Sequence, residues 1–367
     1  MRHLIKTSNL ILLQLVLAAS VIASGLENAA AATDLTRVEQ AGGSWQECAD
    51  IPWKVQELYG TTRDGKVIIA GGMALSEADT PVGIDRTGIY DPATDTWTEG
   101  PALPSARHHS LMISAGGRIY AVGGATHGAS KGHWQPRREV YVLDRTEGWS
   151  TLTQMPVDQT EAMAVEHEGR IHILGGRTPN FDDASRWSEY RDVDWHTVYD
   201  IQSNTWSTAA ALPSPRNSAA VAIIDGLIYV AGGRTMKGGN IANLDRYDPV
   251  TDEWQSLSPM PYAAGGFNGA AVGGKFYVFG GEELGVLGAD GVFAQSMRYD
   301  PETDQWQALP NLPTARHGHA VVPVQGSLFV IGGGALTATG MTTDTLEVYT
   351  PEGNYPPVRC QHSTANE

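Results

Sequence analysis

The sequence has few cysteines and no concentrated run of basic residues. Two Cys among 367 residues cannot cross-link a disulfide-rich mini-protein, nor supply four thiolates to a zinc or iron–sulfur site. The 25 basic residues are outnumbered by 41 acidic ones, for a formal net charge of −16, and they form no stripe that would follow a phosphate backbone. These absences exclude nucleic acid as a partner.

Glycine, in contrast, is abundant. The 42 Gly residues are about 11 % of the chain, against a usual share of roughly 7 %. A hydrophobic fraction of 41 % is enough for a core, so wholesale disorder is excluded. The length alone allows either about two domains or one closed β-architecture.

The amino terminus resembles an export signal. Arg2 and Lys6 precede a largely apolar run, residues 10–22, and small residues follow at 23–25 and 29–32. This order predicts a signal peptide over residues 1–32, cleaved between about 25 and 32, with an uncleaved anchor as the alternative. The mature protein is then expected to be secreted or periplasmic, with no further membrane span. No Asn-x-Ser/Thr sequon occurs, so N-glycosylation is not expected.

An internal repeat dominates the rest of the chain. Six glycine pairs close apolar runs, and their first members are Gly71, Gly123, Gly175, Gly232, Gly280 and Gly332. Each is preceded, by the same 26 positions, by a tryptophan of the set Trp45, Trp97, Trp149, Trp206, Trp254 and Trp306. The distance from a glycine pair to the next tryptophan varies. One half of every repeat therefore has a fixed length, and the other half carries insertions.

Each repeat contains four short apolar segments separated by tight turns and one long loop. Segments of this length with such turns are typical of β-strands, and six sets of four predict an all-β, six-bladed β-propeller. No helical periodicity interrupts the pattern. We expect a single propeller over residues 45–350 and a C-terminal tail over residues 351–367.

The repeat resembles the Kelch family. The matching pattern is Pro-x-x-Arg, an apolar strand, Gly-Lys-x-Tyr-Val-x-Gly-Gly and Tyr-Asp-Pro-x-Thr-x-x-Trp, seen nearly whole over residues 212–254 and 312–349. The resemblance is specific for the fold and weak for function. The motif residues have structural roles: glycine pairs permit close approach of backbones, Asp and Thr cap turn amides, and Trp packs between blades.

The two ends of the repeat region are complementary. The chain begins with a fourth-type strand around Trp45 and ends with a third-type strand around Tyr349, so the amino-terminal strand is expected to complete the sixth blade. Cys48 and Cys360 lie just beyond these strands. We predict that they form a disulfide that joins the termini, with two free buried thiols as the alternative.

Long loops, which gather on one face of the disc, mark the predicted binding face. Positions counted from the glycine pairs place ten polar residues near the channel mouth on this face: Glu57, Arg107, His109, Glu161, Arg177, Arg216, Arg234, Glu282, Arg316 and His317. Five converging arginines predict a small anionic or sugar ligand, because guanidinium groups bind carboxylates with paired hydrogen bonds. The alternative for Arg107, Arg216 and Arg316 is a set of structural salt bridges between blades.

Two loop clusters are further candidates. Asp192, Asp194 and His196 alternate at a spacing of two, which in an extended strand puts them on one face as metal ligands; a solvated acidic loop is the alternative. His127 and His133 flank a second loop with Trp134, either as ligand contacts or as surface residues. Aromatic loops above a polar mouth suit stacking on a sugar ring.

The Kelch resemblance implies both enzymes and binding modules. A galactose-oxidase-like copper site needs a cysteine within the propeller and is disfavoured. Glu189, Asp192 and His196 match the iron-binding run of nitrile-specifier-like proteins imperfectly. In size, blade number and export, the chain is similar to the sialic-acid mutarotases, which implies Glu282 as a catalytic base. No cofactor and no metal are expected. Two functions stay open: binding of a protein, a glycan or a small anionic sugar, or mutarotation of an acidic sugar.

Overall fold

The computed structural model describes residues 38–127, 134–182, 184, 186–283, 291–338, 340–356, 358 and 360. The predicted signal peptide, residues 1–32, lies outside the described residues, as do His133 and residues 361–367 of the predicted tail. No helix in the part of the chain that the structure describes is long and apolar enough to span a membrane.

Six antiparallel sheets of four strands are formed by the described residues, which confirms the six-bladed propeller. Blade one contains β2 (Gly60–Arg63), β3 (Lys66–Ala70), β6 (Thr87–Asp91) and β7 (Thr96–Glu99). Blade two contains β8 (Leu111–Ala115), β9 (Arg118–Val122), β12 (Glu139–Asp144) and β13 (Gly148–Gln154). Blade three contains β14 (Met163–His167), β15 (Arg170–Leu174), β18 (His196–Asp200) and β19 (Thr205–Thr208).

The second half of the propeller repeats this arrangement. Blade four contains β20 (Ala220–Ile224), β21 (Leu227–Ala231), β24 (Leu244–Asp248) and β25 (Glu253–Leu257). Blade five contains β26 (Asn268–Val272), β27 (Lys275–Phe279), β28 (Ser296–Asp300) and β29 (Gln305–Ala308). Blade six contains β30 (Ala320–Val324), β31 (Ser327–Ile331), β32 (Leu346–Pro351) and β1 (Gly43–Glu47).

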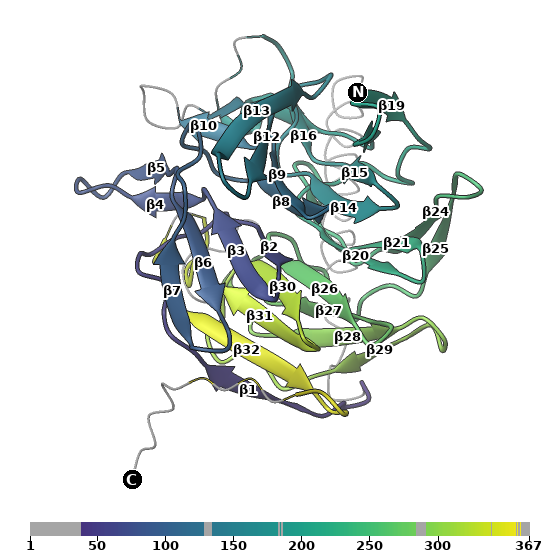
Figure 1. Ribbon diagram of the computed structural model, residues 1–367. Helices are drawn as coiled ribbons and strands as arrows, with labels where there is room; N and C mark the ends of the chain where they lie inside the picture. Colours follow the sequence, from purple (N-terminus) through teal and green to yellow (C-terminus); the bar gives the residue numbers. More distant parts are fainter. Residues whose placement is uncertain are drawn as a thin grey trace, which may run out of the picture. The chain divides into compact units, whose positions relative to one another are not determined.

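The amino-terminal strand closes the ring, as the sequence predicts. β1 lies alongside β32, the last strand of the chain (Figure 1). The antiparallel register pairs Trp45 with Tyr349 and Gly43 with Pro351. Blade six is therefore built from both ends of the propeller, and β32 is paired along both of its edges, with β31 and β1.

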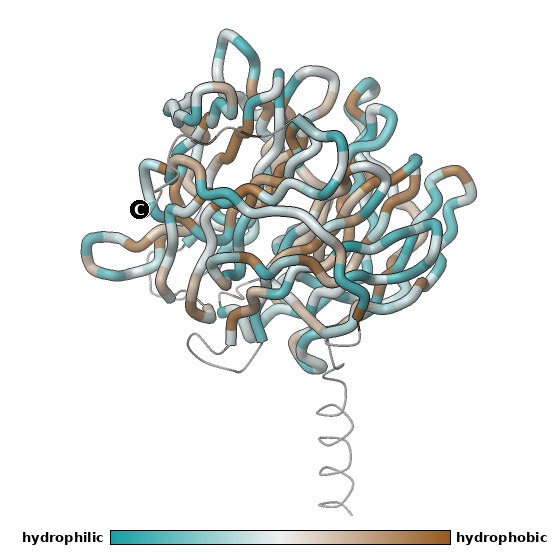
Figure 2. The backbone as a smooth tube through the Cα atoms, turned by 90° about the horizontal axis from the view of Figure 1, so that it is seen from below, coloured by the Kyte–Doolittle hydropathy of each residue, from teal (hydrophilic) through white to brown (hydrophobic). Residues whose placement is uncertain are grey.

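The first strand of every blade lies at the channel. β2, β8, β14, β20, β26 and β30 each contact the corresponding strands of the two neighbouring blades. Hydrophobic and hydrophilic residues alternate in short stretches along the backbone, as Figure 2 shows. The core is thus distributed between the blades, where residues such as Val67, Tyr90 and Phe329 are fully buried.

The glycine pairs act as joints between blades. Gly71 has a φ of +72°, and a side chain there would collide with the carbonyl oxygen of Arg107 in the next blade. The amide of the following residue, Gly72, donates to that same carbonyl at 2.9 Å. Only glycine combines this backbone conformation with so close an approach.

The repeat tryptophans bridge neighbouring blades, in agreement with the prediction. The indole nitrogen of Trp97 donates to the carbonyl of Ala49 at 2.8 Å, and that of Trp254 donates to Ala210 at 2.8 Å. In both cases the acceptor follows the last strand of the preceding blade. Each of these two indoles therefore packs on its own blade and hydrogen-bonds to the preceding one.

The long loops of blades one to four begin with short two-stranded ribbons, which the sequence did not predict. The ribbons pair β4 (Met73–Leu75) with β5 (Pro81–Gly83), β10 (Ala125–His127) with β11 (Trp134–Pro136), β16 (Arg177–Pro179) with β17 (Tyr190–Asp192), and β22 (Arg234–Thr235) with β23 (Gly239–Asn240). A 3-10 helix, η2 (Trp187–Glu189), lies in the loop between β16 and β17. Each ribbon hydrogen-bonds the beginning of its loop to a later segment of the same loop.

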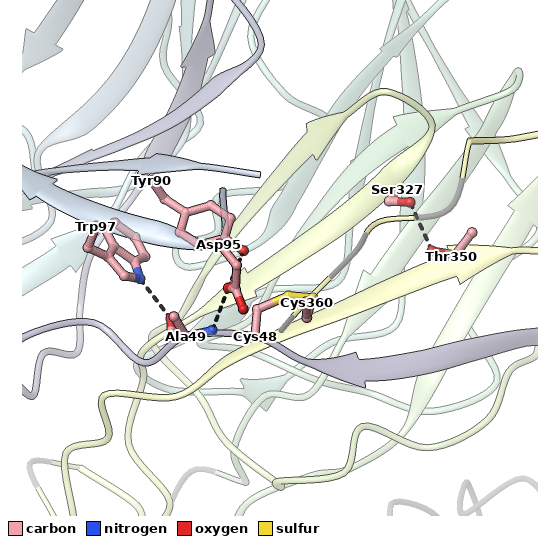
Figure 3. The surroundings of a disulfide bond; sticks show 8 residues. All are labelled: Cys48, Ala49, Tyr90, Asp95, Trp97, Ser327, Thr350 and Cys360. Atoms are coloured by element: carbon pink, nitrogen blue, oxygen red, sulfur yellow. Dashed lines mark hydrogen bonds between the residues drawn. A yellow bond between two sulfur atoms is a disulfide. The ribbon is translucent and has the colours of Figure 1, made fainter. Parts of the chain in front are cut away.

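The predicted disulfide is present. Cys48 and Cys360 are joined, with their Cα atoms 4.7 Å apart (Figure 3). The neighbouring residue Ala49 is held by blade one: its amide donates to Asp95 at 2.8 Å, and its carbonyl accepts from Trp97. The bond therefore joins the C-terminal segment to the point where blade six meets blade one.

Candidate functional site

The channel mouth on the long-loop face is built from two equivalent positions in each blade. The first, which we call the rim position, lies just before the first strand and is occupied by Glu57, His109, Glu161, Ser218, Gly266 and Gly318. The second, the exit position, follows the glycine pair and is occupied by Met73, Ala125, Arg177, Arg234, Glu282 and Gly334. In all six blades the residue before the rim position forms a β-bridge with the exit position. The repeat thus holds both side chains beside the channel.

All six rim residues have a left-handed backbone, including four that are not glycine. Glu57, His109, Glu161 and Ser218 have φ values of 51°, 54°, 52° and 50°. The rim backbones also connect the blades, since the amide of His109 donates to the carbonyl of Glu57 at 2.9 Å and that of Ser218 donates to Glu161 at 3.0 Å. This conformation is costly for a residue with a side chain. Glycine occupies the same position in blades five and six, so the three ionisable residues are not required for the backbone itself.

Acidic and basic side chains form a closed ring round the channel mouth, and every blade supplies one member. In order round the channel, the members of this charge ring are Glu57, His109, Glu161, Arg234, Glu282 and His317. Successive nitrogen–oxygen distances are 2.8 Å (Glu57–His109), 3.9 Å (His109–Glu161), 3.4 Å (Glu161–Arg234), 3.5 Å (Glu282–His317) and 3.6 Å (His317–Glu57), and Arg234 also pairs with Glu282. Acids and bases alternate without interruption.

Burial and mutual pairing set the protonation of the ring. Burial alone would raise the pKa of Glu57, but His109, His317 and Arg234 outweigh it and lower that pKa well below its ordinary value. Burial would likewise lower the pKa of His109, but the charges of Glu57 and Glu161 raise it. The ring therefore favours ionised carboxylates beside a protonated His109.

Arg177 joins the ring from outside, through Glu161. Its Nη1 lies 3.0 Å from the Glu161 carboxylate, and its guanidinium carbon lies 4.1 Å from the centre of the Trp187 ring. The indole nitrogen of Trp187 donates to Glu161 at 3.4 Å. Arg177 also lies 3.7 Å from the carboxylate of Asp192, so both guanidinium groups at the mouth are paired with two carboxylates each, Arg234 with Glu161 and Glu282.

Two half-buried tryptophans border the charge ring. Trp187 lies on η2 beside Arg177, and Trp134 lies on β11 with its ring centre 5.4 Å from that of His109. The sequence marks both only indirectly: they are among the tryptophans that fall outside the 26-residue repeat. They give the mouth exposed aromatic surface next to fixed polar groups.

Three of the predicted arginines do not reach the mouth. Arg107, Arg216 and Arg316 are fully buried, and each pairs with an acidic residue of its own blade: Arg107 with Glu139 at 3.5 Å, Arg216 with Asp245, and Arg316 with Glu347 at 3.0 Å. Their side chains therefore bridge strands within one blade, not between blades as the structural alternative expected. The prediction of five converging arginines is corrected to two, Arg177 and Arg234, and both are paired with carboxylates.

The predicted cluster of Asp192, Asp194 and His196 does not assemble. Asp192 ends the ribbon strand β17 and accepts from Asn217 at 2.6 Å, whereas His196 begins β18 and contacts His172 at 2.9 Å. The chain changes sheet between the two, so the alternation of one extended strand does not apply. Among the described residues, no group of three or more His, Cys, Asp and Glu side chains is placed to hold a metal ion.

Both carboxylate oxygens of Glu282, the predicted catalytic base, have partners. One oxygen pairs with Arg234, and the other accepts from the amide of Ala338 at 3.0 Å. These contacts hold Glu282 in place as a member of the charge ring.

Buried neutral histidines make the fold sensitive to acid. Burial, with Arg316 and His317 nearby, lowers the pKa of His319 from 6.5 to about 3. The unfolded chain takes up this proton near pH 6.5, so the folded state loses about 1.4 kcal/mol per pH unit from this group as the pH falls from 6.5 towards 3. His319→Phe, which copies Phe267 at the same position of blade five, should remove that slope. Urea unfolding at pH 7, 6 and 5 measures it, and an unchanged pH dependence would refute the assignment.

Comparisons with known proteins agree with the architecture. The family model described as the KLHDC2/KLHL20/DRC7 Kelch-repeats domain matches residues 61–281 and 198–366. Kelch-like protein terF of Aspergillus terreus is 26 % identical over 285 residues, which is 76 % of this chain and 60 % of that protein. Kelch-like protein 23 of Mus musculus is 28 % identical over 283 residues, or 76 % of this chain and 46 % of that protein. The chain thus spans about half the length of these relatives.

A solved structure gives the same result for the fold. The structure of YjhT superposes with a TM-score of 0.70 at 17 % identity, covering 85 % of this chain and 99 % of that chain. At this identity the likeness concerns the fold alone. Nearly the whole of that chain is matched by the propeller described above.

Proposed function

Since the chain belongs to the Kelch-repeat family, whose propeller is a scaffold for binding proteins or ligands, we propose that it is an exported binding protein that takes a neutral sugar at the channel mouth. One observation carries the proposal. The charge ring, whose polar groups are fixed in space, is bordered by the half-buried indoles of Trp134 and Trp187.

This combination suits a sugar ring. An indole presents a flat apolar surface on which the C–H face of a pyranose can rest. The carboxylates, guanidinium groups and imidazoles beside it are acceptors and donors for hydroxyl groups. Because the ring members pair with one another, they are already oriented before a ligand arrives, which reduces the entropy cost of binding.

The pairing of the arginines favours a neutral ligand over an acidic one. Arg177 and Arg234 are both engaged with Glu161, and Arg234 also with Glu282. A ligand carboxylate would have to displace one of these acids or lie beside it, and either costs electrostatic energy. Hydroxyl groups carry no such penalty.

Export is part of the proposal. The Cys48–Cys360 disulfide supports it, because such bonds form and persist in oxidising compartments. The engaged state of Glu282 supports binding rather than mutarotation. N-terminal sequencing of the protein recovered from the periplasm or medium tests export, and an intact amino terminus on protein retained in the cytoplasm would contradict it.

A glycan array tests the binding function. Labelled protein should bind neutral glycans, and Trp134→Ala and Trp187→Ala should each weaken that binding at least tenfold, about 1.4 kcal/mol, because the apolar plate is lost. Tyr355→Ala is the matched control, since Tyr355 is a half-buried aromatic packed against Gly273 and Gly326 in the tight turns of the opposite face. An array without signal, or equal binding by all variants, would overturn the proposal.

A further inference from the structure

Three imidazoles surround the indole of Trp134 at the mouth of blade two. The ring centres of His108 and His109 lie 4.5 and 5.4 Å from that of Trp134, and the ring centre of His127 lies 6.3 Å away. His108 and His127 are also in contact, with ring centres 4.7 Å apart. His127 and Trp134 are directly paired across the β10–β11 ribbon, so the repeat and the ribbon together form the cluster.

The cluster is connected to the charge ring through a chain of hydrogen bonds. The Glu57 carboxylate lies 2.8 Å from Nε2 of His109, and Nδ1 of His109 lies 2.6 Å from Nδ1 of His108. At the far end of this chain, Nε2 of His108 is buried and has no hydrogen-bond partner among the described residues. Nδ1 of His127 is in the same situation. Buried polar atoms without a partner are rare and point to a missing ligand or water.

This series of hydrogen bonds also determines which ring nitrogen of His108 carries the proton. Glu57 requires a proton on Nε2 of His109, and the raised pKa of His109 favours a second proton on its Nδ1. That proton is donated to Nδ1 of His108, so His108, whose own pKa burial and His109 lower, carries its single proton on Nε2. A metal ion would need this nitrogen bare. The unpartnered Nε2–H group of His108 is therefore a hydrogen-bond donor, and it lies beside the neutral imidazole of His127.

We propose that His108, His127 and Trp134 form a subsite for one hydroxyl-bearing ring of the sugar. The indole supports the ring, Nε2–H of His108 donates to a hydroxyl oxygen, and Nδ1 of His127 accepts the proton of the same hydroxyl. A hydroxyl group is both an acceptor and a donor, so it matches the donor on His108 and the acceptor on His127, which neither a carboxylate nor a cation does. The subsite rests on the sugar-binding function proposed above, and it names the residues that select a hydroxyl over an acidic group.

The test compares His127→Phe with His167→Phe. Phe at position 127 keeps an aromatic ring beside Trp134 and removes both ring nitrogens, whereas His167 lies at the end of β14, next to a tight turn of the opposite face. The probes are methyl α-D-mannoside, methyl β-D-galactoside, methyl β-D-glucoside and N-acetyl-D-glucosamine, titrated by NMR. We expect His127→Phe to weaken the binding of at least one probe fivefold or more and His167→Phe to leave it unchanged. Long-range nitrogen–proton NMR of the unmodified protein should show the proton of His108 on Nε2.

The outcomes separate the two proposals. Equal affinity of the wild-type protein and His127→Phe would overturn the subsite and leave sugar binding at the mouth standing. A proton on Nδ1 of His108 would overturn the donor assignment. If no probe binds the wild-type protein and the glycan array is also silent, the proposed function fails and the subsite fails with it.

Discussion

Replacing Cys48 and Cys360 together by serine is expected to lower the free energy of unfolding by about 5 kcal/mol. The bond joins residues 312 positions apart, and in the chain-entropy model a loop of this length confers roughly this stabilisation, because the cross-link restricts the unfolded chain. The folded state should be retained, since β1 still pairs with β32 along its whole length. Guanidinium-induced unfolding of the oxidised protein and the double variant measures the difference.

Reduction provides the control for this experiment. Dithiothreitol should shift the unfolding midpoint of the wild-type protein to that of the double variant, and it should not affect the variant itself. Equal midpoints for the oxidised protein and the variant would show that the disulfide does not stabilise the ring. In that case the closure would depend on the strand pairing and on the contacts of Ala49 with Asp95 and Trp97.

The second large effect is expected at Glu161, the residue with most partners in the charge ring. Its carboxylate lies 3.0 Å from Arg177, 3.4 Å from Arg234 and 3.9 Å from His109. Glu161→Gln keeps the shape but leaves buried cations without their counter-charge, which costs about 3–5 kcal/mol. Urea unfolding at pH 7 measures this loss.

An exposed carboxylate supplies the matched control for Glu161→Gln. Asp64 pairs with Arg145 at 2.8 Å, but both side chains are more than half exposed, so Asp64→Asn should leave the free energy of unfolding almost unchanged. Adding Arg177→Met to Glu161→Gln removes one of the unpaired charges. The double variant should therefore be less destabilised than the sum of the single variants. Equal effects at Glu161 and Asp64 would contradict the buried ring.

The sequence predicts the fold because the fold is repeated. A fixed spacing of 26 residues between each tryptophan and its glycine pair places four strands in every repeat. The extra fourth-type strand at Trp45 and the missing fourth strand after Tyr349 predict the closure. Five of the six members of the charge ring lie at rim or exit positions that the same regularity identifies, and the sixth, His317, directly precedes the rim position of blade six. Counting from the glycine pairs works there because the rim and exit positions are tied together by the same β-bridge in every blade.

Positions counted along the sequence do not predict the direction of a side chain where the backbone leaves the extended conformation. Arg107 lies two residues before His109, so alternation would place both at the mouth. The left-handed backbone at His109, with a φ of 54°, interrupts that alternation, and Arg107 turns into its own blade towards Glu139. The same reasoning explains Asp192 and His196, which lie on different sheets. The pairing of each arginine with an acid is a long-range contact that no local pattern encodes.

The most direct test of sugar binding at a mouth with paired arginines is a comparison of two ligands that differ only in charge. The neutral glycan identified on the array and its uronic acid counterpart can be titrated by calorimetry at pH 7 and low salt. The paired state of Arg177 and Arg234 predicts that the neutral sugar binds at least tenfold more tightly. Tighter binding of the uronic acid would contradict the pairing of these arginines and restore an anion site at the channel mouth.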